Sequence, residues 1–139
     1  MTYLQIRQLL EGRLNTCKES NSIKADLVYE NLTYIPTSSP YIKSEFIPNT
    51  QRPTSLGQNP VELLRGLYVI TPHLPSDAGP KAADDMAELI MGNHGFKAGQ
   101  ILSTSSGGSL IVEYTERQRG FLEAPWYYVP IIVAWRVHK

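Results

Sequence analysis

The sequence predicts an α+β fold, in which a mostly antiparallel or mixed β-sheet of about five strands packs against two amphipathic helices. Three observations predict it. Apolar residues recur at helical spacing in two segments, other segments show the alternation or the short apolar runs of strands, and proline- or glycine-containing stretches separate them. With 139 residues, 42% of them hydrophobic, the chain is long enough to bury a core of its own. We therefore expect a single domain spanning residues 1–139.

Residues 2–18 predict the first helix. The apolar side chains of this segment recur every three or four residues and share one face: Ile6, Leu9, Leu10, Leu14 and Cys17. Gly12 weakens the helix by about 1 kcal/mol relative to alanine. Cys17 is the only cysteine, which excludes an internal disulfide, and its place on the apolar face indicates a buried structural thiol.

The first half of the chain then predicts three strands. Residues 25–29 favour a short strand, and after a turn at residues 36–40 the segment 41–47 alternates between apolar and charged side chains, as a half-buried strand does. Residues 48–60 contain three prolines and no periodicity, which predicts a long loop. Residues 61–71 carry apolar side chains on both sides, which predicts a central strand.

A second helix is predicted after a loop at residues 72–80, with Ser76 as its N-cap. That loop has three prolines and a single glycine, so it lacks the glycine-rich turn that cradles a phosphate. Gly92 or Gly95 could end the helix. The expected buried stripe consists of Ala82, Met86, Leu89 and Ile90.

The last third of the chain predicts a hairpin and a closing strand. Residues 100–104 and 110–115 flank the sequence SSGG, whose Gly107-Gly108 pair suits a hairpin turn. Residues 116–125 are predicted to form a charged connection. Residues 127–138 predict the closing strand, with one apolar side made of Val129, Ile131, Val133, Trp135 and Val137.

The aromatic residues near the C-terminus admit two interpretations. Strands rich in aromatic residues can stack the bases of single-stranded nucleic acids, but such platforms come with a basic groove. This region has few cations beyond Arg117, Arg119 and Arg136, so core packing and the covering of an edge strand account better for Trp126 and its neighbours. The chain has 13 basic and 13 acidic residues, and this zero net charge gives no long-range attraction to nucleic acid or membrane.

The sequence predicts no catalytic, cofactor or metal site. The histidines, His73, His94 and His138, are scattered without the spacing of zinc ligands and are expected to be ordinary loop or surface residues. Asp84 and Asp85 are adjacent on a predicted helix, so they point in different directions and fit a solvated face. No apolar run approaches the ~20 residues that span a bilayer, and the N-terminus lacks the pattern of a signal peptide.

Two short motifs carry a resemblance to a known family. Arg65-Gly66-Leu67-Tyr68-Val69 precedes the second predicted helix, and the sequence YYVPIIV at residues 127–133 opens the closing strand. Together with the order of the predicted elements over nearly the whole chain, these motifs resemble the tail-terminator proteins of long-tailed bacteriophages, the family of the lambda minor tail protein U.

The resemblance implies a structural protein without catalysis or cofactors. Members of this family assemble as a hexameric ring on the finished tail tube, where the ring stops growth of the tube and offers a surface for joining the head. The implied partners are other copies of the chain, the major tail tube protein and a head-closure or connector protein, with no membrane and no specific nucleic acid. The implied location is the head-proximal end of the virion's tail, after synthesis in the cytoplasm of the bacterial host.

A ring contact is heterologous and needs two complementary surfaces on each subunit. We expect two groups of side chains to face a neighbouring subunit or the tube: Gln51, Arg52 and Leu56 in the first long loop, and Arg117, Arg119 and Phe121 in the second. One alternative is a head-closure or neck protein of the same particle. Another, from a different class, is a small enzyme or ligand-binding domain, which would need a cleft with convergent polar groups.

Overall fold

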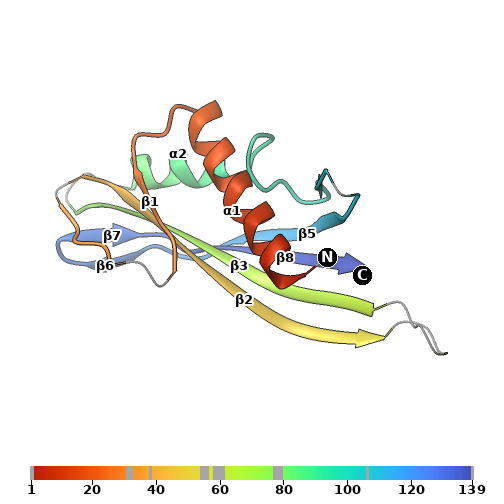
Figure 1. Cartoon of the computed structure of the whole chain (residues 1–139). Helices are drawn as coiled ribbons and strands as arrows, with labels where there is room; N and C mark the ends of the chain where they lie inside the picture. The colour runs from red at the N-terminus through yellow and green to blue at the C-terminus, as the bar shows by residue number, and fades with distance from the viewer. Residues whose placement is uncertain are drawn as a thin grey trace.

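The computed structural model describes residues 2–30, 33–37, 39–53, 57, 62–76, 80–105 and 107–138, and for Thr50 and Arg52 it describes the backbone alone. Within these residues, eight strands form one sheet, and the helices α1 (Tyr3–Ser20) and α2 (Lys81–Ile90) lie on one face of it (Figure 1). The predicted α+β class is confirmed, with more strands in the sheet than the five expected.

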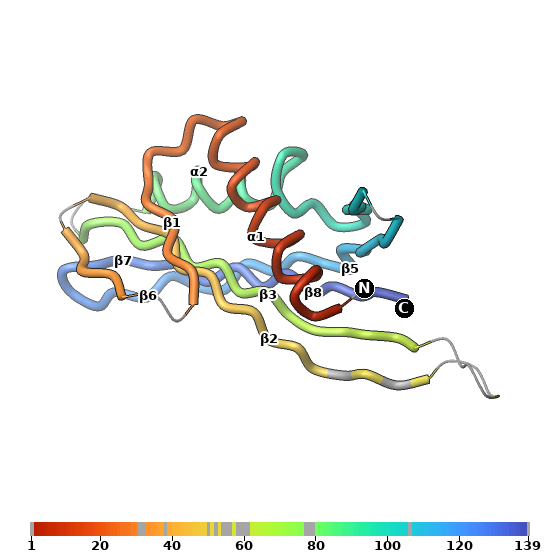
Figure 2. Tube along the Cα trace, viewed as in Figure 1, coloured from red at the N-terminus to blue at the C-terminus, as the bar shows by residue number. Residues whose placement is uncertain are grey.

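Two long hairpins form most of the sheet. The first joins β2 (Tyr41–Pro53) to β3 (Glu62–Pro75). The second runs out along β5 (Ser109–Arg117) and β6 (Phe121–Glu123), and it returns along β7 (Trp126–Tyr128) and β8 (Ile131–His138). Antiparallel pairing of β3 with both β7 and β8 joins the two hairpins. The β6–β7 turn and the described ends of β2 and β3, at Pro53 and Glu62, therefore lie at opposite ends of the sheet, and β2 and β3 project together as an arm (Figure 2).

Two short strands complete the sheet at its sides. β1 (Asp26–Val28) runs parallel to the first residues of β2, and β4 (Ile101–Ser103) runs antiparallel to the start of β5. The resulting order is β1-β2-β3-β8-β5-β4, which places β3 and β8 at the centre, as the apolar residues on both sides of β3 predicted. The predicted hairpin around Gly107 is confirmed, and Gly107 has a φ of +94°, the left-handed region that favours glycine.

Helix α1 matches its prediction closely. Thr2 is the N-cap: its hydroxyl accepts from the backbone N–H of Gln5, and the Gln5 side chain accepts from the Thr2 N–H, which is a capping box. The buried face consists of Ile6, Leu10, Leu14 and Cys17, so the thiol is buried as expected. The Arg13 guanidinium donates to the carbonyls of Asn93 (2.7 Å) and Gly95 (2.8 Å), which holds α1 against the chain that follows α2.

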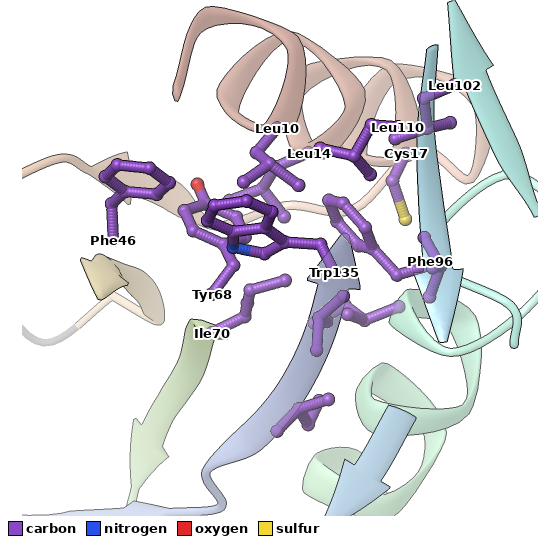
Figure 3. Packing of buried hydrophobic residues seen from close by; sticks show 14 of the residues in the cluster. Leu10, Leu14, Cys17, Phe46, Tyr68, Ile70, Phe96, Leu102, Leu110 and Trp135 are labelled. Carbon is purple, nitrogen blue, oxygen red and sulfur yellow. The ribbon is translucent and has the colours of Figure 1, made fainter. Parts of the chain in front are cut away.

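The core lies between the helices and the sheet, around Trp135 (Figure 3). The Trp135 indole on β8 stacks on the Phe46 ring of β2 with 5.5 Å between ring centroids. Between them in the sheet lies Gly66 of β3, which pairs with Trp135. A Cβ at Gly66 would stand 2.5 Å from the Cζ2 atom of Trp135 and 2.6 Å from the carbonyl oxygen of Ile47. The absence of a side chain at Gly66 is what lets the indole lie on the sheet.

The second helix differs from its prediction in start and in orientation. It begins at Lys81 with Pro80 as N-cap, not at Ser76, because β3 continues to Pro75 and pairs there with β7. Its buried residues are Ala83, Ala87 and Ile90, with Met86 half-buried, whereas two members of the predicted stripe, Ala82 and Leu89, are exposed. The small alanines Ala83 and Ala87 face the sheet and allow close approach, which the predicted i, i+4, i+7, i+8 stripe from Ala82 did not anticipate.

Three other boundaries are corrected. Residues 48–53, predicted as loop, extend β2, and part of the predicted connection at residues 116–125 forms β6. The closing strand is two strands, β7 and β8, separated at Val129 and Pro130. Pro48 and Pro53 fit in β2 because β1 pairs with residues 41–43 only, so the missing N–H groups can point to the outer edge of the sheet, away from β3.

The glycines provide a matched test of this packing. Gly66→Ala should lower the free energy of unfolding by roughly 2 kcal/mol or more, because the new methyl group overlaps Trp135 and a backbone carbonyl. Gly12→Ala should raise it by about 0.5–1 kcal/mol, because Gly12 is exposed within α1 and a Cβ there has no atom within 4 Å. Urea denaturation of the two variants measures both changes, and a tolerated Gly66→Ala would contradict the proposed packing.

Candidate assembly surfaces

The first predicted group lies on the β2–β3 arm. Gln51 is exposed near the end of β2, and its amide is used within the chain: Nε2 donates to Oε2 of Glu62 (2.8 Å), and Oε1 accepts from the Tyr3 hydroxyl (3.3 Å). Gln51 thus connects both strands of the arm to the start of α1. Arg52 follows it in β2 and pairs with Leu63. Leu56 lies outside the described residues.

The second predicted group lies where β5 passes into β6. Arg117 ends β5, and its guanidinium forms an ion pair with the Asp84 carboxylate of α2, so it holds the helix against the sheet. Arg119 is exposed, and its guanidinium carbon lies 5.4 Å from the centroid of the Phe121 ring. Phe121 itself is 39% exposed on β6. Arginine and aromatic side chains of this kind are the residues that dominate protein–protein contacts.

The strand register places the two groups far apart. Arg52 pairs with Leu63, and Phe121 pairs with Tyr128, which in turn pairs with His73. Leu63 and His73 are both on β3, and ten residues of strand span about 33 Å. The structure therefore does not bring the described members of the two groups into one site. The backbones of Gln51 and Arg52 lie at one end of the sheet, and Arg117, Arg119 and Phe121 lie towards the other.

An aromatic ladder connects Phe121 to the body of the sheet. The rings stack in register across four strands: Phe121 on Tyr128 (5.4 Å between centroids), Tyr128 on His73 (5.0 Å) and His73 on Tyr41 (4.5 Å). Tyr34 packs on Tyr41 at the far end. This ladder was not predicted from the sequence. His73 was expected on a loop or the surface, whereas it lies in β3, half-buried. The four rings come from four strands, so only the register brings them together.

The environment of His73 favours its neutral form. Burial is the largest influence on this imidazole and lowers its pKa. The hydrogen bond to Thr71 and the charge of Glu123 raise the pKa and the charge of Lys43 lowers it, and the net shift is downward. The Nδ1 atom lies 2.9 Å from the carbonyl oxygen of Thr71, so Nδ1 carries a proton and donates it to that acceptor. The ladder is therefore held by a neutral ring between two tyrosines.

A hollow of about 390 Å³ lies beside the ladder, between the chain after β1 and strands β2 and β3. Its polar wall includes Glu30, whose carboxylate is already engaged with the Arg7 guanidinium (3.1 Å) and with the backbone N–H of Phe46. Lys43 and Glu45 stand exposed on the same wall. Within the described part of the chain, no three histidine, cysteine or acidic side chains gather to hold a metal ion. No helix in that part is both long and apolar enough to cross a membrane.

Comparison with known proteins identifies the class of this chain. A family model described as "Phage tail terminator protein" matches residues 5–135, and the chain belongs to that family. The resemblance stated from the sequence is thus confirmed. The chain is a structural component of a phage tail, of a family that is not enzymatic.

Two further comparisons were with curated proteins and with solved structures, and the second of these shows a shared fold. No curated protein matches the chain. Seven chains of solved structures match, and one of them is 17% identical, covers 99% of this chain and 96% of its own length, and superposes with a TM-score of 0.70. At this identity the likeness shows a shared fold and nothing further.

The half-buried His73 gives the chain a testable pH dependence. Its pKa in the folded chain lies below the ordinary value of 6.5, so below about pH 6.5 the unfolded chain binds a proton that the folded chain does not. Stability should therefore fall as the pH drops from about 7.5 towards 5.5. His73→Phe keeps the ring stacking and removes this contribution, so its urea midpoint should fall less. An equal fall in His73→Phe and the native chain would show that His73 is not responsible.

Proposed function

We propose that this protein assembles as a ring on the head-proximal end of the tail tube, where it ends tube polymerisation and provides the surface to which the head is joined. The proposal takes the whole chain, residues 1–139, as one domain. Its partners are other copies of the chain, six to a ring as the resemblance implies, the major tail tube protein and a head-closure or connector protein. Membership of the tail-terminator family supports this role.

The separation of the two predicted surfaces is the observation that carries the proposal. A closed ring is built from heterologous contacts, in which one surface of each subunit meets a different surface of the next. The arm with Gln51 and Arg52, and the β6–β7 end with Arg119 and Phe121, lie about 33 Å apart along β3. Each subunit thus offers two different surfaces at opposite ends of a rigid sheet. Leu56 keeps its proposed role in the arm surface.

The edge of β2 favours contacts through side chains over extension of the sheet from one subunit to the next. An added strand needs N–H donors along the edge, but Pro48 and Pro53 have none. The N–H of Phe46 is already bound by the Glu30 carboxylate. Strand addition along β2 is therefore disfavoured, and the arm is expected to meet its neighbour through exposed side chains.

Arg117 takes a different role from Arg119 in this proposal. Its ion pair with Asp84 connects β5 to α2, so it supports the fold locally. Arg119 contacts the Phe121 ring and makes no ion pair with a described residue, which leaves its charge available to a partner. Arg119 and Phe121 are thus the two residues of the second group expected to contact the next subunit or the tube.

Charge reversal at Arg119 tests the proposal. Arg119→Glu should leave the unfolding free energy within about 0.5 kcal/mol of the native value, because the side chain is exposed. Its tails should be overlong under the electron microscope, because the tube is not capped. Lys97→Glu, the same charge change at an exposed site elsewhere, should give tails of normal length.

Two outcomes would contradict the proposed role. Tails of normal length in the Arg119→Glu particles would remove Arg119 from the assembly surface. If particles that lack the protein altogether have tails of normal length that stay unattached to heads, the protein is a head-closure protein instead.

A charge swap tests the structural role of the Arg117–Asp84 ion pair. The double variant Arg117→Asp/Asp84→Arg should retain an ion pair between these two positions and give tails of normal length.

A further inference from the structure

Strand β7 carries two adjacent tyrosines whose rings lie on opposite faces of the sheet. Side chains alternate between the two faces along a strand, so Tyr127 and Tyr128 point in opposite directions. The Tyr128 ring belongs to the aromatic ladder and stacks on Phe121. The Tyr127 ring lies on the helix face, because it packs against a small apolar cluster that includes Ala83 of α2. The two tyrosines therefore meet the rest of the fold on different faces.

Gly120, the residue before β6, lies directly against the Tyr127 ring. Apart from its own chain neighbours, the three heavy atoms nearest to a Cβ at position 120 all belong to that ring. Such a Cβ would overlap the hydroxyl oxygen and Cζ, and it would lie 2.8 Å from Cε2. The chain can approach the ring this closely because glycine has no Cβ. The two tyrosines thus hold Gly120 from one face and Phe121 from the other.

The Tyr127 ring is fixed more firmly than the segment that rests on it. Strand β7 pairs with β3 on one side and with β6 on the other, and the Tyr127 ring packs against buried side chains of β3 and α2. Residues 118–120 lie between β5 and β6, outside either strand. A hydrogen bond from the Gln118 N–H to the carbonyl of Pro130 (2.9 Å) holds this segment at its start. A change at the contact with the ring should therefore displace the segment, and with it Arg119 at its centre.

We propose that Tyr127 is a positioning residue for Arg119. Its ring, fitted against Gly120, fixes the path of residues 118–120 and thereby holds the Arg119 guanidinium beside the Phe121 ring. A surface that already has its bound arrangement loses less conformational entropy when a partner binds. This inference rests on the proposed function, because it takes Arg119 and Phe121 as the residues that contact the next subunit or the tube.

Hydrogen exchange of the Gln118 amide tests the positioning. In Gly120→Ala the new methyl group overlaps the ring, so this amide should exchange roughly tenfold faster or more than in the native chain. The Val112 amide, which donates to the carbonyl of Gln100 (2.9 Å), reports on a remote part of β5 and should keep its rate. Gly12→Ala places a methyl group in open space and should not accelerate exchange of the Gln118 amide. Equal acceleration of both amides in Gly120→Ala would overturn the inference, because it would show a loss of global stability.

A second substitution distinguishes positioning from a general loss of packing. Tyr127→Leu removes the overlapping ring atoms and keeps an apolar side chain against α2. Alone it leaves a gap beneath Gly120, so it too should accelerate exchange of the Gln118 amide. In Gly120→Ala/Tyr127→Leu the new methyl group fills that gap, and the exchange rate should return to within about threefold of the native value. A double variant whose amide exchanges as fast as in either single variant, or faster, would overturn the inference.

Tail length connects the inference to the proposed function. Particles with Gly120→Ala should carry overlong tails, and particles with Gly120→Ala/Tyr127→Leu should carry tails of normal length. If Arg119→Glu gives overlong tails but Gly120→Ala gives normal ones, the positioning role fails and the proposed function stands. If the exchange rates change as expected but Arg119→Glu gives normal tails, the proposed role of Arg119 fails, and Tyr127 still fixes residues 118–120.

Discussion

The contact of the Trp135 indole with Gly66 and Phe46 determines how the two long hairpins meet. Trp135 belongs to the second hairpin, and Gly66 and Phe46 belong to the two strands of the first. One buried ring therefore fixes the first hairpin against the second on the helix side of the sheet. The register that follows from this contact also places the described ends of β2 and β3, at Pro53 and Glu62, far from the β6–β7 turn.

The residues that form the core lie on the helix side of the sheet, away from the surfaces proposed for assembly. The helices and one sheet face enclose the core, and α1 is held there by the Arg13 hydrogen bonds to the chain after α2. The opposite face, the arm and the β6–β7 end lie outside that core. A subunit of this design can present Arg119 and Phe121 without disturbing its packing, because neither side chain belongs to the core between the helices and the sheet.

The outer edge of β2 is poorly suited to pair with a further strand. Prolines at 48 and 53 and the Glu30 carboxylate leave few donors on this edge. An edge that resists further strands fits the role proposed above, in which the protein ends growth of the tube. The aromatic ladder from Tyr41 to Phe121 then supports the Arg119 end through ring stacking, where the exposed β6 has only β7 as a neighbour in the described sheet.

The sequence by itself determined the local elements whose patterns are strong. The buried face of α1, the central position of β3, the hairpin at Gly107 and the inward side of β8 follow from periodicity and turn residues, and the motifs at Arg65 and Tyr127 pointed to the family. Arg119 and Phe121 could be placed together because they are neighbours in the chain. These features depend on contacts within a few residues, which a sequence pattern records.

Tertiary structure alone decided what depends on residues far apart in the chain. It turned α2 so that Ala83 and Ala87 face the sheet, extended β2 through Pro48 by giving it an edge position, and paired Arg117 with Asp84. It also aligned the rings of the ladder across four strands. The physical reason is the same in each case: strand register and the close approach of layers decide which side chains meet, and neither is encoded in local spacing.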